Sequence, residues 1–76
     1  MTKFTMKLDD GETIKVIANK KEGHHDIDIV DVYGKPIGDG LFYDTFGLQD
    51  MNGPFSENDV RAIEKMLKLK LSNIID

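Results

Sequence analysis

The sequence predicts an α+β fold: a small antiparallel β-meander of three to four strands with one C-terminal α-helix packed on one face (β-β-β-β-α). Residues 2–8 and 13–19 alternate polar and apolar side chains on either side of an Asp-Gly turn, as a β-hairpin does. Residues 57–72 repeat apolar side chains every three or four positions, as a helix with one buried face does. The chain has 76 residues, no cysteine and no internal repeat, so we expect a single domain over residues 1–76.

The first two strands form the clearest part of this pattern. Thr2 to Leu8 predicts a half-buried strand with apolar residues at every second position. Asp9-Asp10-Gly11-Glu12 is expected to be the turn, and Thr13 to Asn19 the returning strand. Ile17 points to the opposite face from the other apolar residues, so that face is not wholly polar.

His24 to Tyr33 predicts a third strand whose alternation breaks. Ile27 and Ile29 share one parity, and Val30 and Val32 share the other. Either both faces are partly covered here, or a β-bulge near Ile29-Val30 resets the register.

A fourth extended segment is expected within residues 37–46, over Leu41 to Phe46. Gly38-Asp39-Gly40 interrupts it as a loop or a wide kink. Gly47 to Pro54 is expected to be a loop, since Asn52-Gly53-Pro54 is a strong break before the helix.

The helix start carries a specific signal. Ser56 is a suitable N-cap, and Asp59 lies three residues on, where the acid of a capping box belongs. Phe55 and Val60 occupy the positions of a hydrophobic staple. These residues predict a helix from Glu57 to about Ser72.

The rest of the helix supports the same interpretation. Glu57–Arg61 and Glu64–Lys68 are i,i+4 pairs in the favourable order, each worth about 0.2–0.5 kcal/mol. Asn73 is a candidate left-handed C-cap, after which Ile74-Ile75 would fold back on the core. Packing the helix stripe on the meander predicts a core of Phe4, Met6, Leu8, Ile14, Val16, Ile27, Ile29, Val60, Ile63, Leu67 and Leu71.

Charge is distributed unevenly along the chain. Residues 1–21 carry five lysines and three acids, residues 22–59 nine acids and only Lys35, and residues 60–76 four basic and two acidic side chains. The net charge of −4 therefore conceals an acidic centre between two basic ends. This centre is either a set of solvated loops or an acidic face that meets a basic partner. The lack of a basic excess argues against direct nucleic-acid binding.

Residues suited to catalytic and metal sites are sparse. His24, Asp26 and Asp28 would share one face of a strand and are metal-ligand types, but their spacing matches no established motif, and the adjacent His24 and His25 are interpreted as exposed. The Asp9–Glu12 turn is too short for a calcium loop. The chain has no cysteine nucleophile, nucleophile elbow or phosphate-binding glycine fingerprint. We therefore expect no enzymatic activity, no metal and no cofactor.

Aromatic side chains among the acids favour protein binding, although they could instead pack around the helix end. We expect a small acidic interaction module, an inhibitor or adaptor of a basic, nucleic-acid-handling protein. In size and composition the chain resembles accessory proteins of phages and mobile elements, anti-CRISPR proteins and nucleic-acid mimics among them, which implies carboxylates presented to a positively charged channel. The expected partner-binding residues are Asp26, Asp28, Asp31, Tyr33, Asp39, Phe42, Tyr43, Asp44 and Asp50.

Two other functions stay open. Arg61, Lys65 and Lys68 form a basic stripe that could bind nucleic acid. A structural homodimer could form edge to edge through the fourth strand, or through Met66 and Leu69, so both a monomer and a homodimer fit. The N-terminus has no apolar signal region and apolar runs stop at three residues, so we expect a cytoplasmic protein without a membrane partner.

Overall fold

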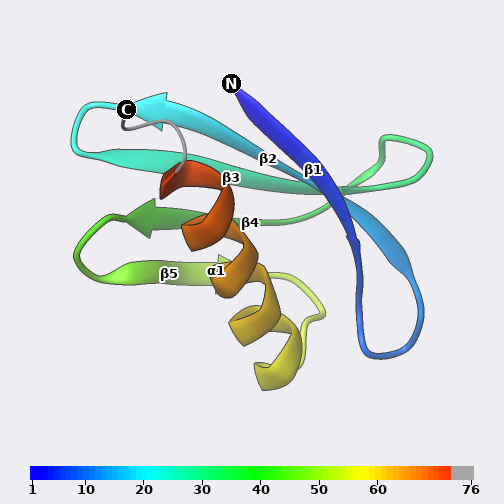
Figure 1. Ribbon diagram of the computed structural model, residues 1–76. Coiled ribbons are helices and arrows are strands. Elements are labelled where there is room, and N and C mark those ends of the chain that lie inside the picture. The colour runs from blue at the N-terminus through cyan, green and yellow to red at the C-terminus, as the bar shows by residue number, and fades with distance from the viewer. Residues whose placement is uncertain (73–76) are drawn as a thin grey trace.

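The computed structural model describes residues 1–72, which form a five-stranded antiparallel sheet and one C-terminal helix on one of its faces (Figure 1). The strands lie in chain order, β1-β2-β3-β4-β5, so the sheet is a meander. The predicted α+β fold class is confirmed, with five strands rather than three to four. The candidate C-cap at Asn73 and the Ile74-Ile75 segment lie outside the described residues. The elements are β1 (Thr2–Lys7), β2 (Thr13–Lys21), β3 (His24–Asp31), β4 (Pro36–Tyr43), β5 (Gly47–Asn52) and α1 (Glu57–Ser72).

The fifth strand occupies a segment that was expected to be a loop. Gly47 pairs with Tyr43, and Leu48 with Phe42, so β5 continues directly from the turn after β4. The alternation of polar and apolar residues does not indicate this strand, for two reasons. The register with β4 shifts between Asp39 and Leu41, and Asp50 adopts a positive φ of 54°, so strict alternation is lost.

The Gly38-Asp39-Gly40 segment lies inside β4 and is not a loop. Both glycines face the helix side of the sheet, where larger neighbours occupy the space that a side chain would need. A Cβ at Gly38 would overlap the ring of Phe55, and one at Gly40 would overlap the sulfur of Met51. The glycines therefore let these two side chains close over β4.

The break in alternation at Ile29-Val30 is a register shift between β3 and β4, as the bulge interpretation predicts. On its other side β3 keeps an unbroken register with β2, from Lys21↔His24 to Ile14↔Asp31. The irregularity therefore belongs to the β3–β4 pairing alone, and the parity of β3 relative to β2 is unaffected.

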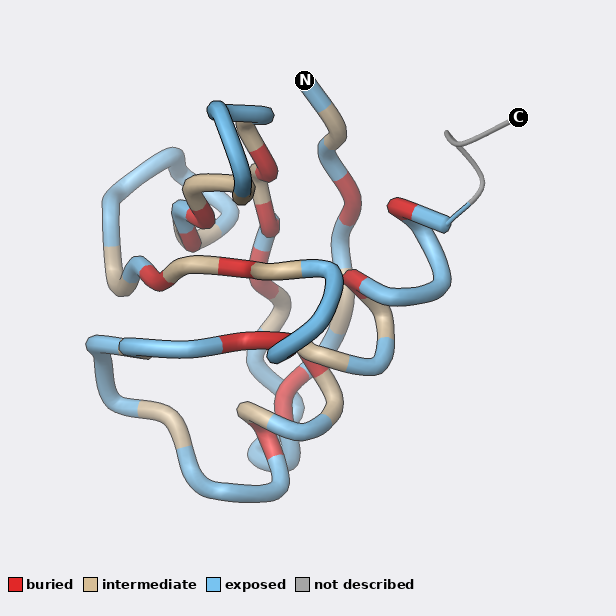
Figure 2. Tube along the Cα trace, turned by 90° about the vertical axis from the view of Figure 1, so that its left-hand side faces the viewer, coloured by how far each residue is buried: buried red, intermediate tan, exposed pale blue. Residues whose placement is uncertain are grey.

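The core lies between the helix and the covered face of the sheet, where buried positions alternate with exposed ones along the strands (Figure 2). Met6 and Val60, both predicted to be in the core, are only partly buried at its margin. Phe42 and Leu48 join the core because β4 and β5 extend the sheet under the helix. The buried apolar residues are Phe4, Leu8, Ile14, Val16, Ala18, Ile27, Ile29, Phe42, Leu48, Ile63, Leu67 and Leu71.

The predicted capping box forms at the start of α1. The Asp59 N–H donates to Ser56 Oγ over 3.1 Å, and the Ser56 N–H points back to Asp59 Oδ2 over 3.4 Å. The other Asp59 oxygen, Oδ1, accepts from the Asp9 N–H over 2.9 Å. Asp59 is the only charged residue buried in the described part of the chain, and it ties the helix start to the β1–β2 turn.

A second carboxylate holds the helix to the opposite end of the sheet. Glu64 was expected to pair with Lys68, but its Oε2 accepts from the Leu48 N–H of β5 over 2.8 Å. Gly47 leaves room for this carboxylate, because a Cβ there would meet it, and its φ of 76° suits glycine. The other predicted pair forms: Arg61 lies 3.5 Å from Glu57, but both are well exposed and the pair contributes little.

We predict that Asp59→Ala lowers the free energy of unfolding by about 2–3 kcal/mol, because it removes the cap and leaves the Asp9 N–H without its acceptor. Urea unfolding followed by circular dichroism measures this change. Glu57→Ala is the matched control, since it removes an acid from the same helical turn whose side chain is 90% exposed, and it should change stability by less than about 0.5 kcal/mol. Equal losses in the two variants would contradict the assigned role of Asp59.

Candidate partner-binding surface

One face of the sheet is covered by α1, and no other element within residues 1–72 covers the opposite face, which we call the open face. One row of paired residues crosses it from edge to edge: Lys3, Ile17, Asp28, Asp39 and Asn52. Because side chains alternate along a strand, every second residue from this row joins the same face. The open face comprises Lys3, Thr5, Lys7, Thr13, Lys15, Ile17, Asn19, Lys21, His24, Asp26, Asp28, Val30, Asp39, Leu41, Tyr43, Gln49, Asp50 and Asn52.

Four of the predicted partner-binding acids come together on the β3–β5 side of this face. They line a shallow depression of about 350 Å³ together with the half-buried Leu41. We call this the acidic depression, and its carboxylates belong to Asp26, Asp28, Asp39 and Asp50. It places negative charge from three adjacent strands around one apolar side chain.

Asn52 organises one wall of the acidic depression. Its Nδ2 donates to Asp39 Oδ1 over 2.9 Å and to the Asp50 carbonyl over 3.2 Å. Asp50 has the positive φ noted above, a conformation that Asp tolerates better than most residues. The irregular pairing of β4 with β5 thus brings the Asp50 residue beside Asp39, although Asp39 pairs directly with Asn52.

An aromatic row borders the acidic depression. The Tyr43 ring lies 5.6 Å from the His24 ring and 6.2 Å from the Phe46 ring, measured between centroids. Phe46 is 72% exposed. His24 Nε2 lies 3.0 Å from Asp26 Oδ1, so this contact joins the row to the acids. Tyr43 was predicted to bind a partner, whereas Leu41, Phe46 and Asn52 were not. Phe46 lies in the β4–β5 turn, and Asn52 reaches this face only through its pairing with Asp39.

The other predicted residues lie elsewhere. The Asp31 carboxylate accepts from the Tyr33 N–H (2.8 Å) and the Lys35 N–H (2.9 Å), so it caps the β3–β4 turn. Tyr33 is 92% exposed at that turn. Phe42 is 3% exposed in the core, so its ring is not available to a partner, and Asp44 lies in the β4–β5 turn.

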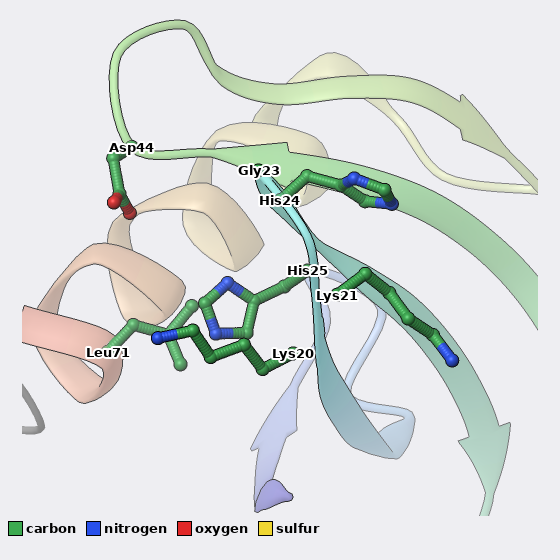
Figure 3. A pocket seen from close by; sticks show the side chains of 7 residues that line it. All are labelled: Lys20, Lys21, Gly23, His24, His25, Asp44 and Leu71. Atoms are coloured by element: carbon green, nitrogen blue, oxygen red, sulfur yellow. The ribbon is translucent and has the colours of Figure 1, made fainter.

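A second pocket, of about 490 Å³, lies where the β2–β3 hairpin meets the last turn of α1 (Figure 3). Lys20 and His25 lie on the helix side of the hairpin with Leu71, whereas Lys21 and His24 point to the other side. The four basic side chains therefore do not converge on one point. This arrangement does not form a cradle for an anion.

His25 has a perturbed environment in this pocket. Burial lowers the pKa of His25 below its usual value of 6.5, and the nearby negative charge of Asp44 partly opposes this by raising it. The positive charge of Lys20 lowers the pKa further. The imidazole is therefore mostly neutral at pH 7, and it meets the Phe42 ring in an edge-to-face arrangement at a centroid distance of 6.4 Å.

Within residues 1–72, no three His, Cys, Asp or Glu side chains are grouped so that they could hold a metal ion, and His24 and Asp26 form only a pair. No helix in this range is long and apolar enough to cross a bilayer.

Comparison with protein families, curated proteins and solved structures finds no match to this chain. The surface chemistry alone therefore carries the functional argument.

We predict that stability falls as the pH is lowered from 7.5 to 5.5. The pKa of His25 is lower in the folded protein than in the unfolded chain, so the unfolded chain binds the proton first as the pH falls through 6.5. Urea unfolding at several pH values should show this loss, and His25→Gln should reduce it. His24→Gln keeps His25 and should retain the dependence. An identical pH profile for wild type and His25→Gln would contradict the assignment.

Proposed function

We propose that this protein is a non-catalytic interaction module whose acidic depression binds a basic segment of a partner protein. The observation that carries the proposal is the convergence of Asp26, Asp28, Asp39 and Asp50 from three strands onto one depression around Leu41. The acids lie on the face that α1 leaves open, and Leu41 among them is an apolar side chain that solvation of the acids alone does not require.

The chemistry of the depression suits arginine in particular. A carboxylate accepts two parallel N–H bonds from a guanidinium, and such pairs are stronger than bonds between neutral groups. Leu41 offers an apolar surface to the methylene stem of an inserted side chain. Tyr43 and the exposed Phe46 offer ring faces on which a guanidinium can stack.

The proposed partner is a cytoplasmic protein with a basic groove, such as one that handles nucleic acid. The acids of the depression would occupy that groove in place of phosphates and block it, and the attraction between opposite charges would speed the encounter. An inhibitor of the anti-CRISPR type belongs to this class. An adaptor that recruits a basic protein would use the same surface, since both roles need only binding.

The decisive experiment is affinity capture of partners from a host lysate, followed by direct binding measurements with the captured protein. We predict that Asp28→Asn/Asp39→Asn weakens binding at least about tenfold, because each Asp lost removes a charge-assisted contact. Glu12→Gln/Glu22→Gln is the matched control, since it changes the net charge equally through exposed turn residues away from the depression. Equal binding by both double variants would contradict the proposal. Asp31 is left unchanged because it caps a turn.

A gel-shift assay at low salt tests the alternative of nucleic-acid binding through Arg61, Lys65 and Lys68. We expect no shift at micromolar protein. The side chain of Arg61 already lies against Glu57, and the open face carries carboxylates that repel phosphate. A shift abolished by Lys65→Glu/Lys68→Glu would favour the alternative.

A further inference from the structure

The open face is divided into two halves of opposite charge. Its β1–β2 half carries four lysines, and its β3–β5 half carries the carboxylates of the acidic depression. The row from Lys3 through Ile17 and Asp28 to Asp39 passes from one half to the other within four strands. The lysines are Lys3, Lys7, Lys15 and Lys21.

We propose that two copies of this chain associate through their open faces, with the basic half of each copy on the acidic half of the other. A two-fold axis parallel to the strands reverses the strand order of the second copy. With that axis between β2 and β3, Lys3 of each copy lies opposite Asp39 of the other, and β1–β2 lies on β3–β4. The interface is isologous, so each charged pair occurs twice.

The middle of the open face is mixed in character. Ile17, Val30 and Leu41 are half-buried apolar side chains on β2, β3 and β4. In the arrangement above, Ile17 of each copy lies opposite Asp28 of the other and Val30 lies opposite Lys15, because these residues are paired across β2 and β3. The opposite charges of the two halves, rather than an apolar centre, therefore carry the association.

A second copy matches this surface better than a uniformly basic partner does. A wholly basic partner would face four lysines over the β1–β2 half, whereas a second copy satisfies both halves at once. The molecule measures 33 × 23 × 18 Å, so one face offers only a small interface. We therefore expect a weak dimer that high salt dissociates.

This inference is independent of the proposed function but uses some of the same residues. The dimer covers Asp28 and Asp39, so a basic partner protein would compete with the second copy for the acidic depression. A chain that stays monomeric would leave partner binding unaffected, and failure to capture a partner would leave the dimer unaffected. The two claims therefore fail separately.

Sedimentation velocity of the full chain, from about 10 μM to about 1 mM and at low and high salt, tests the dimer. We expect the weight-average mass to rise towards that of a dimer at low salt and to return to that of a monomer at high salt. Lys3→Glu/Lys15→Glu places two acids in the basic half, and Asp28→Lys/Asp39→Lys places two bases in the acidic half. Each variant alone should bind itself at least about tenfold more weakly than wild type.

Mixing these two variants is the most discriminating test. The mixture should associate as a heterodimer, because each substituted half then faces the opposite charge. Only folded proteins can form this heterodimer. Lys65→Glu/Lys68→Glu and Glu12→Lys/Glu22→Lys are the charge-matched controls away from the open face, and both should behave as wild type. Zero-length carbodiimide cross-linking of wild type supplies a readout without substitutions: we expect an intermolecular Lys3–Asp39 link. A monomer at the highest concentration, a dimer that Lys3→Glu/Lys15→Glu leaves intact, or cross-links confined to other surfaces would overturn the proposal.

Discussion

One sixteen-residue helix covers a five-stranded sheet, and a single helix can shield only one of its two faces. Two carboxylates hold it there: Asp59 joins the helix start to the β1–β2 turn, and Glu64 joins its middle to β5. The bonds act at opposite edges of the sheet, so the helix cannot shift without breaking one of them. The position of the helix thereby determines which side chains meet water on the open face.

The strand β4 shows how the covered face and the open face depend on each other. On the covered side it carries Gly38 and Gly40, because Phe55 and Met51 fill the space above them. On the open side the same strand carries Asp39 and Leu41 at the centre of the acidic depression. The same short segment therefore packs closely beneath the helix on one side and presents a charged, accessible surface on the other. Changes to either glycine would disturb both.

Much of the fold could be predicted from the sequence because it rests on local patterns. The first hairpin, the capping box at Ser56 and the helix from Glu57 depend on neighbours within a few residues, and all three were predicted. The strand β5 was missed because the positive φ at Asp50 and the shifted register with β4 remove its alternation. A short strand with an irregular register gives no periodic signal that a sequence pattern can detect.

The candidate surface could be predicted in kind but not in shape. The acidic centre with aromatics is visible in the composition, yet which acids converge depends on register. Asp31 has the same chemistry as Asp28, but it caps a turn. Phe42 and Phe46 are four residues apart, but Phe42 lies in β4 on the covered face and is buried, whereas Phe46 lies in the β4–β5 turn and is exposed. Which of the predicted acids lie together therefore depends on the pairing of strands that are distant in the sequence.

The most direct measurement of the central claim is a nuclear magnetic resonance titration of the ¹⁵N-labelled chain with an arginine-rich peptide. If the acidic depression is the binding surface, the backbone amides of β3, β4 and β5 around Asp28, Asp39 and Leu41 will shift in a saturable way. The backbone amide resonances of α1 will not shift. Shifts centred on α1, or changes spread evenly over all exposed acids, would contradict the account.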